Sequence, residues 1–240
     1  MKAYLEAHEV EKLEDKAGLL RDKLLIRLLF RLGCRISELL GLRIEDIDFQ
    51  SGTLTIKQLK QRVQLFCPRC NARLVRQYIF CSRCGAKVSE LTQKPEQRQR
   101  MRRLPVDEHM LCMLKQFIED GGTAKKEDGT YLFSINRHRA WQIVKKCAER
   151  AELPKLVNPD TGRLHYVSPH RLRDAFAVHA VKSDDSGDGL RMLQQHLGHQ
   201  SIATTMRYRK VSGDEHRRWY RRLWEKPGAK GEANGNTDIT

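Results

Sequence analysis

The chain has 240 residues, with 45 Lys or Arg against 30 Asp or Glu, a net charge of +15 and a pI near 9.7. This length allows one large domain or two small ones, and the excess positive charge favours a polyanionic partner, most simply nucleic acid. The chain has neither the apolar run of about eighteen residues that a membrane helix needs nor the start of a signal peptide, so we expect no membrane partner and a cytoplasmic, DNA-associated protein.

The first predicted elements are helices. Apolar residues recur at helical spacing through residues 8–32, which predicts two helices, and Gly33 interrupts the pattern before a short helix at 35–41. Arg35 opens that short helix, and if it is buried it needs a partner. Glu38, three residues further on, is on the same helix face and could supply one. A purely structural ion pair between them is the alternative to a functional role.

Two short strands are predicted next. Residues 53–56 alternate as an edge strand would, and a second strand is predicted at 101–106, some forty residues later. If these two strands pair as an antiparallel hairpin, residues 61–100 form an insertion at its tip.

The insertion carries two CxxC pairs separated by ten residues. Such pairs can offer four thiolates to one zinc ion, and Gly85 suits the tight turn after the second pair. A pair of redox-active CxxC motifs is the competing interpretation. We predict a zinc-ribbon-like module with one structural Zn²⁺, held by Cys67, Cys70, Cys81 and Cys84.

The insertion is also strongly basic. Residues 60–103 contain 12 Lys or Arg against two Glu, so even with a zinc–thiolate centre they hold about +8 of the net charge of +15. An insert of this size is too small for its own core, so metal binding would supply much of its folding energy. Its charge favours a contact with DNA over the alternative, a purely structural role in holding the long hairpin together.

Downstream, the pattern predicts a capped helix at 107–118, a polar loop at 121–129, a short apolar stretch and helix within 131–151, and a helix at 212–226. The helix at 212–226 would pack either on its own domain or on a neighbouring subunit. Residues 227–240 are rich in Gly and Asn and are predicted to be disordered. Outside the CxxC pairs, small buried side chains are predicted for Cys34, Cys112 and Cys147.

The chemistry is predicted to lie in residues 168–210. Ser168 and Pro169 form a typical cap and first turn of a helix, and His170 and Arg173 are three residues apart on one of its faces. A second His, His199, stands in Leu-Gly-His, and Tyr208 follows nine residues later.

This set suits phosphoryl transfer. A phenolic oxygen can attack phosphorus, while Arg and His can stabilise the charge on the non-bridging oxygens. Nearby cationic Arg35 and Arg173 are expected to favour the phenolate of Tyr208, and a neutral His could accept its proton. Tyr166 and Tyr220 are the rival nucleophiles; Tyr166 lies in a strand-like stretch where a packed ring is the simpler explanation.

Two stretches resemble the conserved boxes of tyrosine recombinases, the phage integrase family. The first is LGCRISELLGL at residues 32–42, and the second is PHRLRDAFAVHA followed by LQQHLGHQSIATTMRYRK, within residues 169–210. The resemblance implies an α+β, mainly α catalytic domain with a small antiparallel sheet. The domain would span residues 1–226, with 61–100 inserted as the zinc-binding hairpin and 227–240 as a tail.

The resemblance also implies a reaction and a set of roles. Tyr208 would form a 3′-phosphotyrosyl link to double-stranded DNA, with Arg35, Arg173, His170 and His199 stabilising the transition state. Lys60 fits the position of the lysine that protonates the 5′ leaving oxygen, with Lys57 and Lys94 as rivals. No ATP and no catalytic metal would be required. Strand exchange would need a homotetramer on synapsed DNA, and a monomer is compatible with free solution.

The chain departs from the resembled family in two respects. It enters the catalytic pattern almost at once, without the N-terminal domain that closes around DNA, so that domain was removed or the zinc module replaces part of its grip. Asp174 stands where the family more often has His, at a position we place outside the phosphate-binding set.

Two rival functions remain. A type IB topoisomerase uses similar chemistry to relax supercoils without a defined site. A non-catalytic zinc-ribbon DNA-binding regulator could be built on the same scaffold, although such a protein need not keep the whole set of five Arg, His and Tyr residues.

Overall fold

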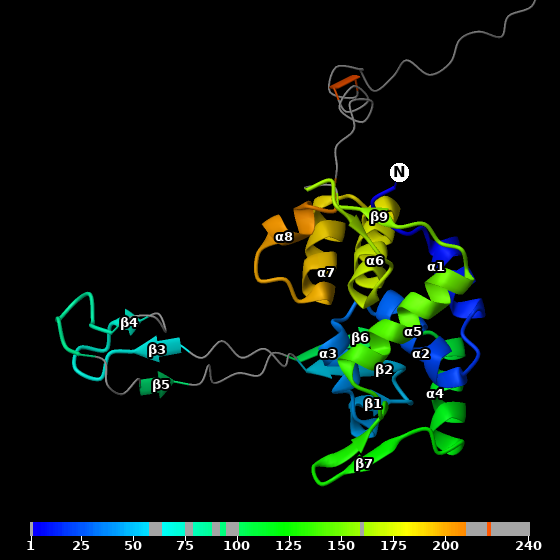
Figure 1. The fold of residues 1–240 in the computed structure, drawn as a ribbon, viewed down its shortest axis with the longest axis horizontal. Coiled ribbons are helices and arrows are strands. Elements are labelled where there is room, and N and C mark those ends of the chain that lie inside the picture. The colour runs from blue at the N-terminus through cyan, green and yellow to red at the C-terminus, as the bar shows by residue number, and fades with distance from the viewer. Residues whose placement is uncertain are drawn as a thin grey trace, which may run out of the picture.

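The computed structural model describes residues 2–57, 64–74, 79–87, 92–94, 101–158, 161–209 and 220–221. Figure 1 shows a mainly helical body with short strands. In chain order the elements are α1 (Ala7–Asp15), α2 (Leu20–Arg31), α3 (Ile36–Leu40), η1 (Ile44–Asp46), β1 (Ile47–Asp48), β2 (Thr53–Lys57), β3 (Gln64–Phe66), β4 (Arg73–Leu74), β5 (Thr92–Lys94), β6 (Met101–Pro105), α4 (Glu108–Glu119), β7 (Ala124–Lys126), β8 (Gly129–Tyr131), α5 (Arg137–Arg150), β9 (Leu156–Val157), β10 (Leu164–His165), α6 (Pro169–Ser183), α7 (Gly187–Leu197) and α8 (Ile202–Met206).

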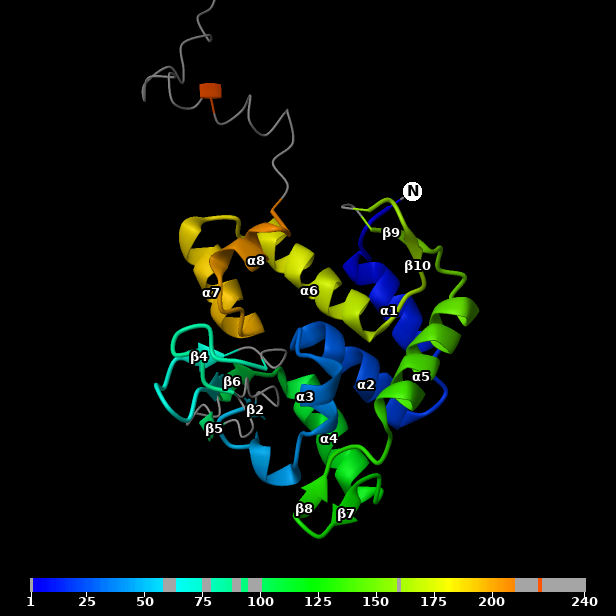
Figure 2. The same ribbon diagram turned by 60° about the vertical axis from the view of Figure 1, so that its left-hand side comes forward.

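Helix α2 lies at the centre of the helical body and contacts α1, α4 and α6 (Figure 2). Its leucines follow the helical repeat predicted from the sequence, and Leu24, Leu25, Leu28 and Leu29 are fully buried. Each buried leucine side chain contributes roughly 1.5–3 kcal/mol to stability. The two helices predicted within residues 8–32 are confirmed, and so is the short helix that follows Gly33.

The interrupted hairpin is also confirmed. Strands β2 and β6 pair antiparallel from Thr53 opposite Pro105 to Lys57 opposite Met101. The prediction of an edge strand was wrong, because β1 pairs with the other side of β2 and makes it the central strand of the order β1-β2-β6. The alternation in β2 reflects one face on the core, where Leu54 and Ile56 are buried.

The inserted region has a sheet of its own, with strand order β4-β3-β5 (Figure 1). Its apolar cluster is small and consists of Cys67, Leu74 and Cys81, with the other two CxxC cysteines and Ala72 packed against it. Among the described residues of the insert, this cluster is centred on the four cysteines.

Helices α6 and α7 pack around a second apolar cluster, formed by Ala177, Val181, Leu190, Leu193 and Leu197. Phe176 contacts both this cluster and the main core, so it joins the two. Helix α6 begins as predicted, with Ser168 at the N-cap position and Pro169 in the first turn, but the Ser168 side chain makes no capping hydrogen bond. This arrangement fixes the start of α6 and the end of α7 close to the loop after α2.

Several local predictions need correction. The polar loop predicted at 121–129 contains part of the hairpin β7–β8, and the short hairpin β9–β10 was not predicted. Cys34 and Cys147 are buried as expected, whereas Cys112 is exposed on α4. Tyr166 is 47% exposed rather than packed in the core, and Lys145 and Lys155 lie over its ring.

Within the described residues, no helix combines the length and apolar character that crossing a membrane requires. The predicted tail at 227–240, and the predicted helix at 212–226 except for Tyr220 and Arg221, lie outside the described residues.

Candidate active site

The first part of the site is built on Glu38, a buried carboxylate held by two arginines. Its Oε1 accepts a hydrogen bond from Arg35 Nη1 at 2.8 Å, and its Oε2 accepts one from Arg102 Nη2 at 2.8 Å. The predicted pairing of Arg35 with Glu38 is therefore confirmed, with Arg102 of strand β6 as an additional partner. Burial raises the pKa of Glu38, but Arg102 and Arg35 outweigh it, so the pKa lies below its usual value.

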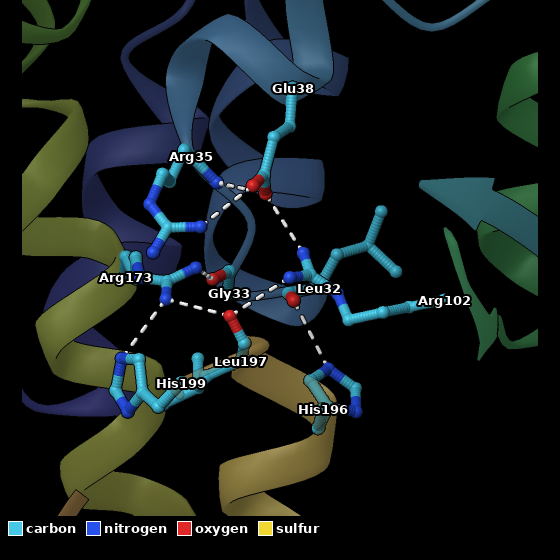
Figure 3. Close-up of polar contacts among 9 residues, drawn as sticks. All are labelled: Leu32, Gly33, Arg35, Glu38, Arg102, Arg173, His196, Leu197 and His199. Carbon is cyan, nitrogen blue, oxygen red and sulfur yellow. Dashed lines mark hydrogen bonds and ion pairs between the residues drawn. The ribbon is translucent and has the colours of Figure 1, made fainter. Parts of the chain in front are cut away.

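Arg173 lies next to this group and is itself buried. Its Nη1 donates to the Gly33 carbonyl, and its Nη2 donates to the Leu197 carbonyl at 2.9 Å. Figure 3 shows the guanidinium groups of Arg35, Arg102 and Arg173 converging from α3, β6 and α6. Burial and the charge of Arg35 lower the pKa of Arg173 to about 10, which leaves it cationic at neutral pH.

The Leu-Gly-His motif has a clear geometric role. Leu197 O accepts hydrogen bonds from both Arg173 and Arg102, the latter at 3.0 Å. Gly198 adopts φ of 67°, and a Cβ there would lie 1.9 Å from Arg102 Nη1. Glycine is therefore required so that the loop can turn and Arg102 can reach the carbonyl. The loop after α7 is thus joined to α6 and to the sheet.

His199 is held by Arg173 and Thr205. Its Nε2 lies 3.1 Å from Arg173 Nη2, and its Nδ1 lies 2.9 Å from Thr205 Oγ1. Because a guanidinium can only donate, Nε2 is the acceptor and the proton is assigned to Nδ1. Burial, followed by the charge of Arg173, lowers the His199 pKa to about 4, so the ring is neutral at pH 7.

Tyr208 also contacts His199: the two rings stack with their centroids 6.4 Å apart. The phenolic O–H donates to Asp174 Oδ1 at 2.8 Å. Burial and then Asp174 raise the pKa of Tyr208, and these effects outweigh the opposite effect of Arg173. Arg173 therefore favours the phenolate, as expected, but burial and Asp174 have the larger effect and keep the phenol protonated.

His170 lies with Tyr208 rather than with the arginines. Its ring is 69% exposed, and its Nε2 is 3.8 Å from Asp174 Oδ1. Arg35, Arg173 and His199 form one group, and His170, Asp174 and Tyr208 form a second. The stacked rings of His199 and Tyr208 join the two groups.

The predicted lysine cannot be located. Lys60 lies outside the described residues, and only the backbone of Lys94 is described, in β5. The rival Lys57 ends β2 and forms an ion pair with Asp46 at 2.6 Å.

The four CxxC cysteines meet in one cluster, with all four sulfurs within 4.8 Å of one another. The Sγ distances are 3.7 Å from Cys67 to Cys84 and 3.6 Å from Cys70 to Cys81. Four sulfurs arranged tetrahedrally at 2.3 Å from a zinc ion would be about 3.8 Å apart. The donor set and its spacing therefore fit a closed zinc site.

The two halves of the cluster have matching turns. Asn71 N donates to Cys67 O and Gly85 N donates to Cys81 O, and both Asn71 and Gly85 have positive φ. The sequence indicated this turn only at Gly85. Asn is the other residue type that tolerates this conformation, so Asn71 marks the equivalent position in the first pair.

Three residues of the site were not predicted. Arg102 shares the inward face of β6 with buried Leu104, and this alternation would have revealed an arginine that needs a partner. Asp174 was noticed only as a departure from a pattern. Thr205 is fully buried and orients His199, and no sequence signal points to it.

A first prediction concerns Glu38. Glu38→Gln should lower the free energy of unfolding by about 3 kcal/mol, because it leaves two arginines without a balancing charge. Since folding lowers the Glu38 pKa, its contribution is present above the unfolded value near 4.5 and is lost as pH falls through the folded value. Urea unfolding at pH 7 and pH 3 measures both effects.

The matched control is Glu45→Gln. Glu45 is also paired with an arginine and a lysine, but its side chain is 62% exposed. Exposed ion pairs contribute little, so unfolding should change by less than about 0.5 kcal/mol. Equal effects of the two substitutions would contradict the role assigned to Glu38.

Three guanidinium groups, two histidines and a tyrosine thus lie close together, from the residues after α2, strand β6, the start of α6 and the loops after α7 and α8. The chain belongs to the phage integrase family, which matches residues 3–94 and 81–215. This agrees with the resemblance seen in the sequence.

Curated relatives are tyrosine recombinases. The chain is similar to tyrosine recombinase XerA of Pyrococcus furiosus, with 28% identity over 222 residues that cover 87% of this chain and 57% of the relative. It is similar to tyrosine recombinase XerD of Bifidobacterium longum, with 31% identity over 219 residues that cover 87% of this chain and 58% of the relative. The chain thus spans little more than half the length of these relatives.

Solved structures share the fold. The crystal structure of XerA recombinase matches with a TM-score of 0.60 and 21% identity, over 94% of this chain and 67% of that one. XerH site-specific recombinase, bound to a palindromic difH substrate after cleavage, matches with a TM-score of 0.60 and 19% identity, over 93% of this chain and 54% of that one.

Proposed function

We propose that this chain is the catalytic part of a site-specific tyrosine recombinase that cleaves and rejoins double-stranded DNA. The observation that carries the proposal is the convergence of Arg35, Arg173 and His199 beside Tyr208. Such cationic groups suit the charge that develops on a phosphate under attack. Family membership and the named relatives support the same function.

In the proposed reaction Tyr208 attacks a phosphate and forms a 3′-phosphotyrosyl link, while the 5′ oxygen leaves. Arg35 uses Nη1 for its hydrogen bond to Glu38. In the contacts of the described residues, its Nε and Nη2 remain as donors for a phosphate oxygen. Arg173 is held in place by two carbonyls, and His170 lines the exposed side. Lys60 is proposed to protonate the leaving oxygen, with Lys57 and Lys94 as alternatives.

The energy of the broken bond is retained in the phosphotyrosine, so neither ATP nor a catalytic metal is needed. We further propose that residues 1–226 form the catalytic domain with 61–100 inserted, and that four protomers act together on synapsed DNA. The basic insert would add to the electrostatic grip on DNA.

A library of nicked suicide DNA duplexes tests the function. Cleavage a few nucleotides from the nick releases a short fragment that carries the 5′ hydroxyl, so religation is prevented, the covalent complex accumulates and the attached DNA can be sequenced. A single enriched sequence supports site-specific recombination. Adducts on unrelated sequences together with relaxation of supercoiled plasmid would favour a type IB topoisomerase, and no adduct on any duplex would favour a non-catalytic regulator.

A second prediction concerns zinc. Protein purified without chelator should contain one Zn²⁺ per chain, and Cys81→Ser should lose most of it, since one of four thiolates is removed. Limited proteolysis should then cut within residues 61–100 while the helical circular dichroism persists. The slope of log DNA affinity against log salt should become shallower if the insert contacts DNA.

Cys112→Ser is the control for this measurement. Cys112 is exposed on α4 and lies outside the cluster, so this variant should keep its zinc and its resistance to proteolysis. Wild-type protein without zinc would contradict the metal assignment.

A further inference from the structure

Asp174 occupies an unusual place for a carboxylate in a site that binds phosphate. It is buried on α6, and its two oxygens have different partners. Oδ2 accepts a hydrogen bond from Arg171 Nη1 at 2.9 Å, while Oδ1 accepts the Tyr208 O–H at 2.8 Å. The ion pair with Arg171 orients the carboxylate, and Oδ1 is directed at the candidate nucleophile.

Two histidines lie near Tyr208. His170 approaches Asp174, at 3.8 Å, rather than accepting the phenolic hydrogen bond, and His199 is not arranged to take the phenolic proton. Its Nε2 already accepts from Arg173, and its Nδ1 carries the proton that faces Thr205. Its ring stacks on that of Tyr208 at an interplanar angle of 15°, so its in-plane nitrogens do not point at the stacked ring. Among the described residues, Asp174 is the group whose basic lone pair contacts the Tyr208 oxygen.

We propose that Asp174 is the catalytic base that accepts the proton of Tyr208 during DNA cleavage, an inference that rests on the recombinase function proposed above. As the Tyr208 oxygen bonds to phosphorus, its proton passes to Asp174 Oδ1. The bond from phosphorus to the 5′ oxygen breaks, and that oxygen leaves as a hydroxyl with a proton from the general acid, the role proposed for a lysine. In religation the 5′ hydroxyl attacks phosphorus and gives its proton back to the lysine, while Asp174 returns its proton to the departing phenolic oxygen.

The electrostatics support this step. Burial and Asp174 raise the Tyr208 pKa, so the phenol stays protonated at rest and its deprotonation must accompany attack. An ionised Asp174 beside a phosphate would be repulsive, but the transferred proton neutralises it as the phosphotyrosine forms. Arg171 balances the charge before transfer, and the positive charge of Arg173 opposes part of the rise in the Tyr208 pKa.

A cavity of about 160 Å³ adjoins the Tyr208–Asp174 pair and has room for several water molecules. Apart from the pair itself, the titratable and charged groups that line it are Tyr4 from the N-terminal segment, His170 and Arg171 from α6, and Arg207 beyond α8. These groups, together with water, could carry a proton between Asp174 and solvent, and their titration belongs in any pH profile of the reaction.

Single-turnover adduct formation on the captured suicide duplex tests the proposal. Asp174→Asn keeps an oxygen that can accept the Tyr208 hydrogen bond but removes the base, so the rate at pH 7 should fall about 10²-fold. That rate should recover as pH rises, because hydroxide replaces the missing base. Asp174→Glu keeps the carboxylate and should recover part of the rate at pH 7. Asp174→Asn loses the charge that pairs with Arg171, so its melting temperature should fall and its DNA affinity should stay equal or rise; rates are therefore compared at saturating DNA and well below both melting temperatures.

A duplex with sulfur in place of the 5′ bridging oxygen separates this role from that of the general acid. Sulfur leaves without protonation, so it should rescue a lysine variant that lacks the acid but leave the Asp174→Asn defect in place. Rescue of Asp174→Asn by sulfur would overturn the assignment. So would an Asp174→Asn rate equal to or above that of wild type, which would mean that the contact only restrains Tyr208.

The wild-type protein provides a measurement that does not depend on a variant folding. With an ionised carboxylate as base, the rate should change little between about pH 6 and 8.5, whereas a reaction that relies on hydroxide rises about tenfold per pH unit. If part of the pH–rate profile slopes in wild-type protein and is flat in His170→Gln, that slope comes from titration of the His170 imidazole. If wild-type protein forms no adduct on any duplex, the recombinase function fails and the Asp174 assignment fails with it; an adduct with hydroxide-dependent kinetics overturns the assignment alone.

Discussion

Tyr208→Phe is expected to abolish covalent adduct formation on suicide DNA while leaving DNA affinity within about twofold of wild type. Phenylalanine keeps the ring that stacks on His199 and packs on the α6–α7 cluster, and removes only the attacking oxygen. One hydrogen bond to Asp174 is lost, so the free energy of unfolding should fall by about 1 kcal/mol. Gel separation of the protein–DNA adduct, with binding measured in parallel, checks both expectations.

The controls for Tyr208→Phe are Tyr166→Phe and Tyr220→Phe. Both rings are exposed in the structure and lie in basic surroundings in the sequence, so charge alone could make them appear to be nucleophiles. Each variant should still form the adduct at the wild-type rate. If mass spectrometry maps the DNA adduct to any residue other than Tyr208, Tyr208 is not the nucleophile.

Arg173→Lys is expected to reduce the rate of adduct formation by about 10²- to 10³-fold, on the scale of a lost oxyanion donor. The guanidinium donates to Gly33 O and Leu197 O and contacts His199 at the same time. A single ammonium group cannot reproduce this fork of donors and still present hydrogens to a phosphate. At least one of these three contacts should be lost, so unfolding should also become easier by about 1–3 kcal/mol.

Stability and catalysis can be separated for Arg173→Lys by assaying well below its melting temperature. Arg150→Lys, an exposed change at the end of α5, controls for the loss of a guanidinium in general and should leave both properties unchanged. If all the protein is bound to DNA and Arg173→Lys forms the adduct within threefold of the wild-type rate, Arg173 does not act in catalysis.

The helical framework could be predicted because it depends on local patterns. The repeat of leucines in α2, the Asp107 cap of α4 and the separated strands β2 and β6 all follow from spacing and composition, and each is found in the structure. The order of the sheet could not be predicted, since β1 has only two residues and carries no periodicity.

The candidate site was predictable in composition but not in arrangement. The spacing of His170 and Arg173 indicates a shared helix face, yet Arg173 is buried against two carbonyls while the His170 ring is largely exposed. Which partners these residues meet depends on contacts between distant segments. Arg102 is 64 residues from Glu38 and 95 from Leu197, so no local pattern could have assigned it to the site.

The pairing of Lys57 with Met101 has a consequence for how such a protein can be rebuilt. In an antiparallel pair the two chains lie only about 5 Å apart, so everything between these residues leaves and re-enters the sheet at nearly the same point. A short turn could close that gap without moving the strands on either side. We therefore expect that replacing the residues between Lys57 and Met101 with a short turn would leave β2, β6 and Arg102 in place, while removing both Lys60 and Lys94.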